Sequence, residues 1–175
     1  MKTLIIFDSL YGNTEIIARD IAKAFPPENI SVFNVKEAKV ADLLEVQLLI
    51  VGSPTYGGHP KQETKEFLDM IPTAALSGKK VAAFDTRFLA KEQNFGLRML
   101  MKMIGYAAPR ILKSLISKGG ESVSSPTGFI VQGKKGELKA GERERATAWG
   151  KSLLLFWKSI KIKSVNIKLE NQKYE

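Results

Sequence analysis

An apolar run, a short polar loop and a helical pattern follow one another near the start of this chain and restrict its fold more than any other feature. Residues 4–7, Leu-Ile-Ile-Phe, have the composition of a buried parallel strand. The polar loop at residues 9–14 leads into a helical apolar stripe that begins at Ile16. A strand, a polar turn and a helix in this order direct backbone N–H groups and the positive end of the helix dipole towards an anion. The segment therefore predicts a phosphate-binding loop.

This loop differs from two widespread phosphate-binding loops. A nucleotide-hydrolase loop closes with Gly-Lys-Ser/Thr, and no lysine lies between Lys2 and Lys23. The dinucleotide fingerprint needs three spaced glycines, and this segment has only Gly12. An ordinary helix cap formed by Asn13 or Thr14 stays open as an alternative.

Strand and helix patterns alternate along the rest of the chain. Further strands are expected at 30–35, 48–51, 81–84 and 129–131, the last with a shorter extended piece at 122–123; helical patterns are expected at 40–44, 64–71, 97–115 and 142–157. This order predicts an α/β fold in which helices cover both faces of a five-stranded parallel sheet. A phosphate loop after the first strand favours the strand order 2-1-3-4-5.

Two helix details and the C-terminal segment add separate expectations. Pro109 is expected to kink or divide the long helix, and Gly150 to let the last helix approach the sheet closely. We expect one domain over residues 1–158 and a basic extension over 159–175. Because apolar and polar residues alternate in the extension, it is expected to form an edge strand or to pair with another chain, with a frayed tail as the alternative.

Composition and charge limit the classes of function. The chain has 175 residues and no cysteine, which excludes disulfides, thiol catalysis, iron–sulfur ligation and thiolate zinc sites. Residues 1–60 hold five Lys/Arg and seven Asp/Glu, a charge of −2, whereas residues 61–175 hold 22 and 11, a charge of +11. This asymmetry suggests an acidic partner or an anionic membrane surface, or a solvated basic face. Nucleic acid is disfavoured because aromatic residues do not interleave the lysines. No signal peptide or membrane span is recognisable, so we expect a cytoplasmic protein.

Two more loops are expected beside the phosphate loop, because the carboxyl ends of parallel strands meet at one edge of a sheet. The loop after the third strand, residues 53–60, places Tyr56 beside Gly57-Gly58, which suits a planar ring; a tight turn with an exposed tyrosine is the alternative. The loop after the fourth strand, residues 85–88, supplies Asp, Thr, Arg and Phe.

The three loops together resemble the flavodoxin family. Ser-x-Tyr-Gly-Asn-Thr at residues 9–14 is similar to the Ser/Thr-x-Thr-Gly-Asn-Thr loop that binds the FMN phosphate in that family, with Tyr11 in place of a threonine. The resemblance implies that Tyr56 packs on the flavin ring and that the loop after the fourth strand contacts its pyrimidine side, where an Arg87 near N1 and the C2 oxygen would stabilise anionic reduced flavin. Phe88 is a candidate cover for the second face, with a core position as the alternative. The family's Gly-x-Gly-Asp pattern is absent after the fourth strand. The residues expected to bind FMN are Ser9, Leu10, Tyr11, Gly12, Asn13, Thr14, Pro54, Thr55, Tyr56, Gly57, Gly58, Asp85, Thr86 and Arg87.

The resemblance implies an FMN protein that carries electrons between redox proteins, without catalytic residues of its own. An FMN-dependent NAD(P)H:quinone oxidoreductase is the alternative, and a phosphate-ligand binding module without redox chemistry is a third. The basic charge departs from the usual acidity of flavodoxins and favours an acidic redox partner.

Two other features are expected to stand outside the chemistry. His59 is the only histidine, so a metal site or catalytic triad lacks its usual partners. Met99, Met103 and Tyr106 form a helical stripe beside basic residues, for which a homodimer contact is expected ahead of a partner or membrane surface.

Overall fold

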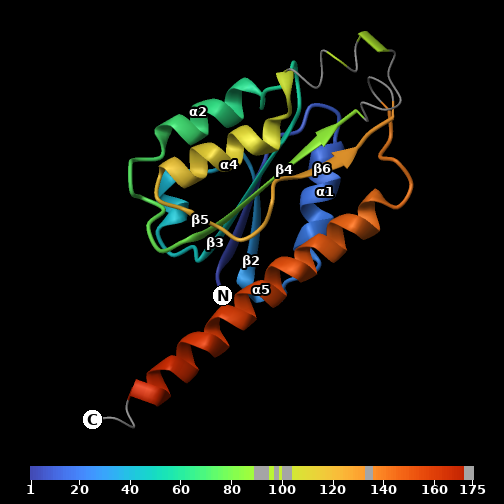
Figure 1. Ribbon diagram of the computed structural model, residues 1–175. Helices are drawn as coiled ribbons and strands as arrows, with labels where there is room; N and C mark the ends of the chain where they lie inside the picture. The colour runs from blue at the N-terminus through green and yellow to red at the C-terminus, as the bar shows by residue number, and fades with distance from the viewer. Residues whose placement is uncertain (89–94, 97–98, 100–103, 133–135, 172–175) are drawn as a thin grey trace.

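A parallel sheet between two helical layers forms the body of the protein (Figure 1). The computed structural model describes residues 1–88, 95–96, 99, 104–132 and 136–171. The strands are β1 (Thr3–Phe7), β2 (Ile30–Asn34), β3 (Leu48–Pro54), β4 (Lys80–Arg87), β5 (Glu121–Ser122) and β6 (Thr127–Ile130). Their order is β2-β1-β3-β4-β5, and β6 also pairs with β4. The α/β class and the predicted strand order are confirmed.

The fifth strand of the prediction consists of two short strands along one edge of β4. Lys80 is paired with Glu121 at the start of β4, and Arg87 with Ile130 at its end. Pro126 lies between the two pieces and has no N–H group to donate to a sheet. The predicted order places the fifth strand beside the fourth, and both pieces pair with β4.

Helices cover both faces of the sheet, as predicted. The helices are α1 (Asn13–Ala22), α2 (Gln62–Met70), α4 (Ala107–Ser117) and α5 (Glu142–Asn171), with short 3₁₀ helices η1 (Pro27–Asn29) and η2 (Val40–Leu43). Helices α2 and α4 lie on one face, and α1 and α5 lie on the other (Figure 1).

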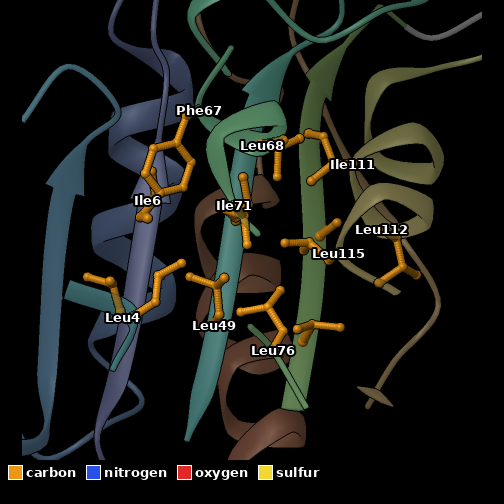
Figure 2. Packing of buried hydrophobic residues seen from close by; sticks show 14 of the residues in the cluster. Leu4, Ile6, Leu49, Phe67, Leu68, Ile71, Leu76, Ile111, Leu112 and Leu115 are labelled. Atoms are coloured by element: carbon orange, nitrogen blue, oxygen red, sulfur yellow. The ribbon is translucent and has the colours of Figure 1, made fainter. Parts of the chain in front are cut away.

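Alternate residues of the same strand supply the two cores. Leu4 and Ile6 of β1 point to the face covered by α2 and α4, where Phe67 and Ile111 complete the packing (Figure 2). Ile5 belongs to the opposite core, against α1 and α5. Because both faces are buried, β1 is apolar at consecutive positions instead of alternating.

The break in the predicted long helix lies before Pro109, not at it. Helix α4 starts at Ala107, after Gly105 with φ 80° and Tyr106 with φ −136° and ψ 164°. Pro109 lies in the first turn of α4, where its missing N–H leaves no helical hydrogen bond unmade. The prediction for Pro109 is therefore wrong. Met103, part of the predicted stripe, lies outside the described residues.

Helix α5 packs on α1, and a buried carboxylate ties the two helices together. Asp20 accepts a hydrogen bond of 2.7 Å from Nε of Arg143, and its carbonyl accepts one of 3.0 Å from the Thr147 hydroxyl. A Cβ on Gly150 would lie 2.6 Å from the Ile21 carbonyl oxygen. Gly150 thus allows close contact between two helices, and its predicted contact with the sheet is wrong.

The extension continues α5 and does not form a strand. The helix passes residue 158 and ends at Asn171, and its C-terminal half projects away from the body (Figure 1). No glycine or proline follows Gly150 to end the helix. The expected edge strand at 159–175 is therefore wrong over 159–171, while the domain boundary at 158 stays a prediction. Within the described ranges, no helix combines the length and hydropathy that crossing a membrane requires.

Candidate functional site

A pocket of about 730 Å³ opens at the carboxyl ends of β1, β3 and β4, where the three loops were predicted to meet. Eleven of the fourteen predicted residues line it: Leu10, Tyr11, Asn13, Thr14, Pro54, Thr55, Tyr56, Gly57, Gly58, Thr86 and Arg87. Ser9, Gly12 and Asp85 are not among the lining residues. Segments far apart in the sequence thus surround one cavity, as expected for a parallel sheet.

The loop after β1 leaves the start of α1 without a side-chain cap. Gly12 is the N-cap residue, has φ 86°, and provides no side chain to bond the first turn. The Asn13 amide instead donates to the Gly136 carbonyl at 2.8 Å, and the Thr14 hydroxyl lies 2.8 Å from the Thr86 hydroxyl. The alternative in which Asn13 or Thr14 caps the helix is therefore wrong. Their side chains tie the loop to neighbouring segments.

The same loop contains a buried hydroxyl without a partner. Oγ of Ser9 is inaccessible to solvent and has no hydrogen-bond partner within the described chain. A buried polar atom of this kind requires explanation, because native structures pair nearly all of them. The first N–H groups of α1 also need an acceptor from outside the helix. Together these donors suit a phosphate group.

Behind the loop, Asp8 joins the end of β1 to the start of α2. It accepts hydrogen bonds from the ammonium group of Lys61 at 3.0 Å and from the Thr64 hydroxyl at 3.3 Å. Burial lowers the pKa of Lys61, but the bonds to Asp8 and Glu63 outweigh it and raise the pKa above its ordinary value. Lys61 therefore stays a cation beside the pocket, which it lines.

The loop after β3 ends in a tight hairpin turn. The backbone N–H and carbonyl groups of Tyr56 and His59 pair at 2.9 and 3.0 Å. Gly57 and Gly58 both have positive φ, 54° and 80°, as a two-residue turn of the I′ type requires. Tyr56 is 75% exposed at the pocket, so its ring is available to a ligand. His59 is an exposed turn residue.

Two predicted ligand residues hold the start of α4. Thr55 Oγ1 accepts a hydrogen bond from the N–H of Ala107 at 2.9 Å, and Asp85 accepts one from Ala108 at 2.7 Å. The fully buried Asp85 also pairs with Nε and Nη2 of Arg87. Burial raises the pKa of Asp85, and these hydrogen bonds oppose that rise. Asp85 therefore lies beneath the pocket and orients the residues around it.

Arg87 contacts both an aromatic ring and a carboxylate. Its guanidinium carbon lies 3.8 Å from the centre of the Tyr106 ring, and its Nε and Nη2 pair with Asp85. A Cβ on Gly128 would lie 2.1 Å from Nε of Arg87, so a larger residue there would displace the guanidinium group from this position. Tyr106 lines the pocket, as does Phe88. Its assignment to the predicted dimer stripe is wrong, because Tyr106 is the N-cap residue of α4 and not part of a continuous helix.

Sequence reasoning missed several lining residues that belong to no motif. They come from the start of α2, from the segment before α4 and from the loop between β6 and α5: Lys61, Gln62, Glu63, Ile104, Gly105, Val131 and Gly136. Pro60, which ends the predicted loop 53–60, also lines the pocket. Only the fold brings these segments together. Gly105 has a positive φ and forms the turn that brings Ile104 and Gly105 to the pocket. The sequence shows this glycine, but it does not show which segments the turn brings together.

Comparison with known proteins agrees with this geometry. The family model of the flavodoxin domain matches residues 4–109. A flavodoxin of Maridesulfovibrio salexigens is 36% identical over 89 residues, which cover 47% of this chain and 61% of that protein. A flavodoxin of Clostridium saccharobutylicum is 26% identical over 157 residues, which cover 87% of this chain and 95% of that one.

Solved structures share the whole fold. An archaeal flavodoxin superposes with a TM-score of 0.69 at 19% identity, covering 87% of this chain and 96% of its own. Oxidised flavodoxin 1 of Bacillus cereus gives 0.67 at 21% identity, covering 88% and 97%. Such identities show the fold alone, whereas the family model matches more than half of the sequence. The chain therefore belongs to the flavodoxin family, whose cofactor is FMN.

Proposed function

We propose that this protein is an electron carrier that holds one FMN in the pocket at the carboxyl ends of β1, β3 and β4. One observation carries the proposal: a single cavity joins an uncapped helix N-terminus to an exposed tyrosine beside a two-glycine turn. FMN has a phosphate at one end and a planar ring at the other. The bound flavin supplies the redox chemistry, and the chain supplies binding and electrostatics.

The phosphate belongs at the start of α1. The first N–H groups of the helix are donors that a dianion would satisfy. The unpaired Ser9 hydroxyl, which does not line the pocket, would join them by rotating about χ1. Asn13 and Thr14 act by fixing the loop to Gly136 and Thr86, since their side chains are already bonded there. Gly12 permits the left-handed backbone at the cap.

The ring belongs between the loops after β3 and β4. Tyr56 covers one face, because its side chain is 75% exposed and lines the pocket. Tyr106 or Phe88 covers the other. Arg87 brings a guanidinium group to this end, but its pairing with Asp85 reduces the positive field. We therefore expect Arg87 to stabilise anionic reduced flavin less than an unpaired arginine would.

The partner is a redox protein, and we propose that its docking surface is acidic. Residues 61–175 carry a formal charge of +11, and they include the start of α2, the segment before α4 and the loop between β6 and α5, which line the pocket. Opposite charge on the partner would speed association at low salt. We also propose that the protein is cytoplasmic. Its sequence has no cysteine, so the fold does not depend on disulfides formed in an oxidising compartment.

Absorbance of the purified protein, followed by anaerobic NADH or NADPH, tests the function. A carrier should show a bound-flavin spectrum that bleaches with dithionite but stays oxidised with either nicotinamide for minutes. Rapid bleaching by a nicotinamide, followed by turnover with a quinone, would favour the quinone reductase. Lack of any flavin binding would leave the non-redox phosphate-binding module.

A further inference from the structure

Arg110 connects two walls of the pocket without lining it. From the first turns of α4, its Nε donates to the Gly58 carbonyl at 3.0 Å, and its Nη2 donates to the Ile104 carbonyl at 3.0 Å. Gly58 and Ile104 both line the pocket, whereas Arg110 does not. One guanidinium group therefore bridges the turn after β3 and the segment before α4.

Side-chain packing joins the same two walls. A Cβ on Gly58 would lie 1.9 Å from Cγ2 of Ile104, so the glycine is in direct contact with that side chain. A Cβ on Gly57 would meet nothing within 4 Å. The turn is therefore fixed at Gly58 and open at Gly57, the glycine that follows Tyr56.

We propose that Arg110 is a positioning residue that sets the place of the Tyr56–His59 turn over the ring end of the pocket. The inference rests on the proposed function, because the ring end is defined by the flavin. Arginine suits this task because its planar fork can reach two carbonyls at once, whereas a lysine ammonium on a flexible stem acts as a point charge. Arg110 would thereby influence the flavin potential through the position of the turn.

The charge of Arg110 must be separated from its geometry. Arg110→Gln removes the charge and most of the fork, and Arg110→Lys keeps the charge but loses the fork. Lys113→Gln is the matched control, because it removes the same charge from an exposed position of the same helix. All three changes lie on the exposed face of α4, where substitution leaves the core intact.

The first measurement uses the protein without flavin. Amide hydrogen exchange at Tyr56 and His59, whose N–H groups bond each other's carbonyls across the turn, should be about tenfold faster in Arg110→Gln, the effect of losing roughly one hydrogen bond to a charged group. Arg110→Lys should show most of this increase, and Lys113→Gln none. Unchanged exchange in both Arg110 variants would overturn the proposal whether or not the protein binds FMN.

The second measurement uses the FMN-loaded protein. FMN and riboflavin should both bind about tenfold more weakly to Arg110→Gln, because only the ring end is altered. Both Arg110 variants should shift the flavin midpoint potential relative to Lys113→Gln. If Arg110→Lys matches the wild type while both Gln variants shift alike, the charge alone acts and the positioning role is refuted. A wild type that binds no flavin overturns the proposed function, while the exchange measurement still decides the role of Arg110.

Discussion

Replacing Asp85 with asparagine should cost the protein a large part of its stability. The carboxylate is fully buried, and it accepts from two nitrogens of Arg87 and from the N–H of Ala108. Asparagine keeps one acceptor oxygen but turns an NH₂ group towards donors. The Arg87 side chain, only 16% exposed, then lacks its counter-ion.

Removing one partner of a buried ion pair costs about 3–5 kcal/mol. Because Arg87 retains some contact with water, we expect the lower end of that range, about 3 kcal/mol. For a chain of this size the loss corresponds to a melting temperature roughly 6–12 °C lower. Urea unfolding of the flavin-free protein, followed by circular dichroism, measures the loss in unfolding free energy.

Two comparisons make the result specific to the ion pair. Asp69→Asn removes the same charge from an exposed position on α2 and should change the unfolding free energy by less than about 0.5 kcal/mol. Adding Arg87→Leu to Asp85→Asn should recover part of the loss, because no unpaired charge then remains. If Asp85→Asn is as stable as Asp69→Asn, the carboxylate does not support the pocket as described.

Three further substitutions test other parts of the molecule. Tyr56→Ala should increase the fluorescence of bound flavin and shift its potential, whereas Tyr56→Phe should be nearly silent, because the ring face makes the contact; flavin fluorescence indifferent to both changes would exclude stacking. Gly57→Ala places a Cβ where φ is +54°, at a cost of about 1 kcal/mol, and should change the separation of the two one-electron potentials more than FMN affinity; spectroelectrochemistry that shows the reverse would contradict this. Burial raises the pKa of Asp20, but hydrogen bonds from Arg143 and Lys23 outweigh it and lower the pKa. The stability that Asp20 contributes is therefore present above the unfolded pKa of about 4 and lost as the pH falls through the lower folded value. Denaturation between pH 2 and 6 should show a flatter acid limb for Asp20→Asn, and identical slopes would refute the assignment.

The fold could be predicted largely because each strand carries its own pattern. The composition of residues 4–7 and 48–51 predicts buried strands, and these segments lie in β1 and β3, respectively. The predicted edge strand in the C-terminal extension was wrong because a short alternation of apolar and polar residues does not exclude a helix. No glycine or proline follows Gly150 to interrupt α5 before Asn171. The local sequence pattern does not show whether a segment will pair with a neighbouring strand.

The site was predicted as a set of loops, but not as a network. Motifs placed Thr55 and Asp85 near the ring, whereas their side chains bond the first N–H groups of α4. Tyr106 was assigned to a helix surface because its periodicity fits one, but the turn at Gly105 brings it to the pocket. These roles depend on contacts between distant segments, which a single sequence does not reveal.

Titration of the flavin-free protein with FMN and with riboflavin tests the central claim most directly. The two ligands share the ring and the ribityl chain and differ only in the phosphate. FMN should bind at least about tenfold more tightly, since the phosphate gains roughly 1.5–3 kcal/mol from each charge-assisted hydrogen bond. Ser9→Ala should reduce that preference while leaving riboflavin affinity unchanged. Equal affinity for FMN and riboflavin in the wild type would contradict a phosphate site at the start of α1.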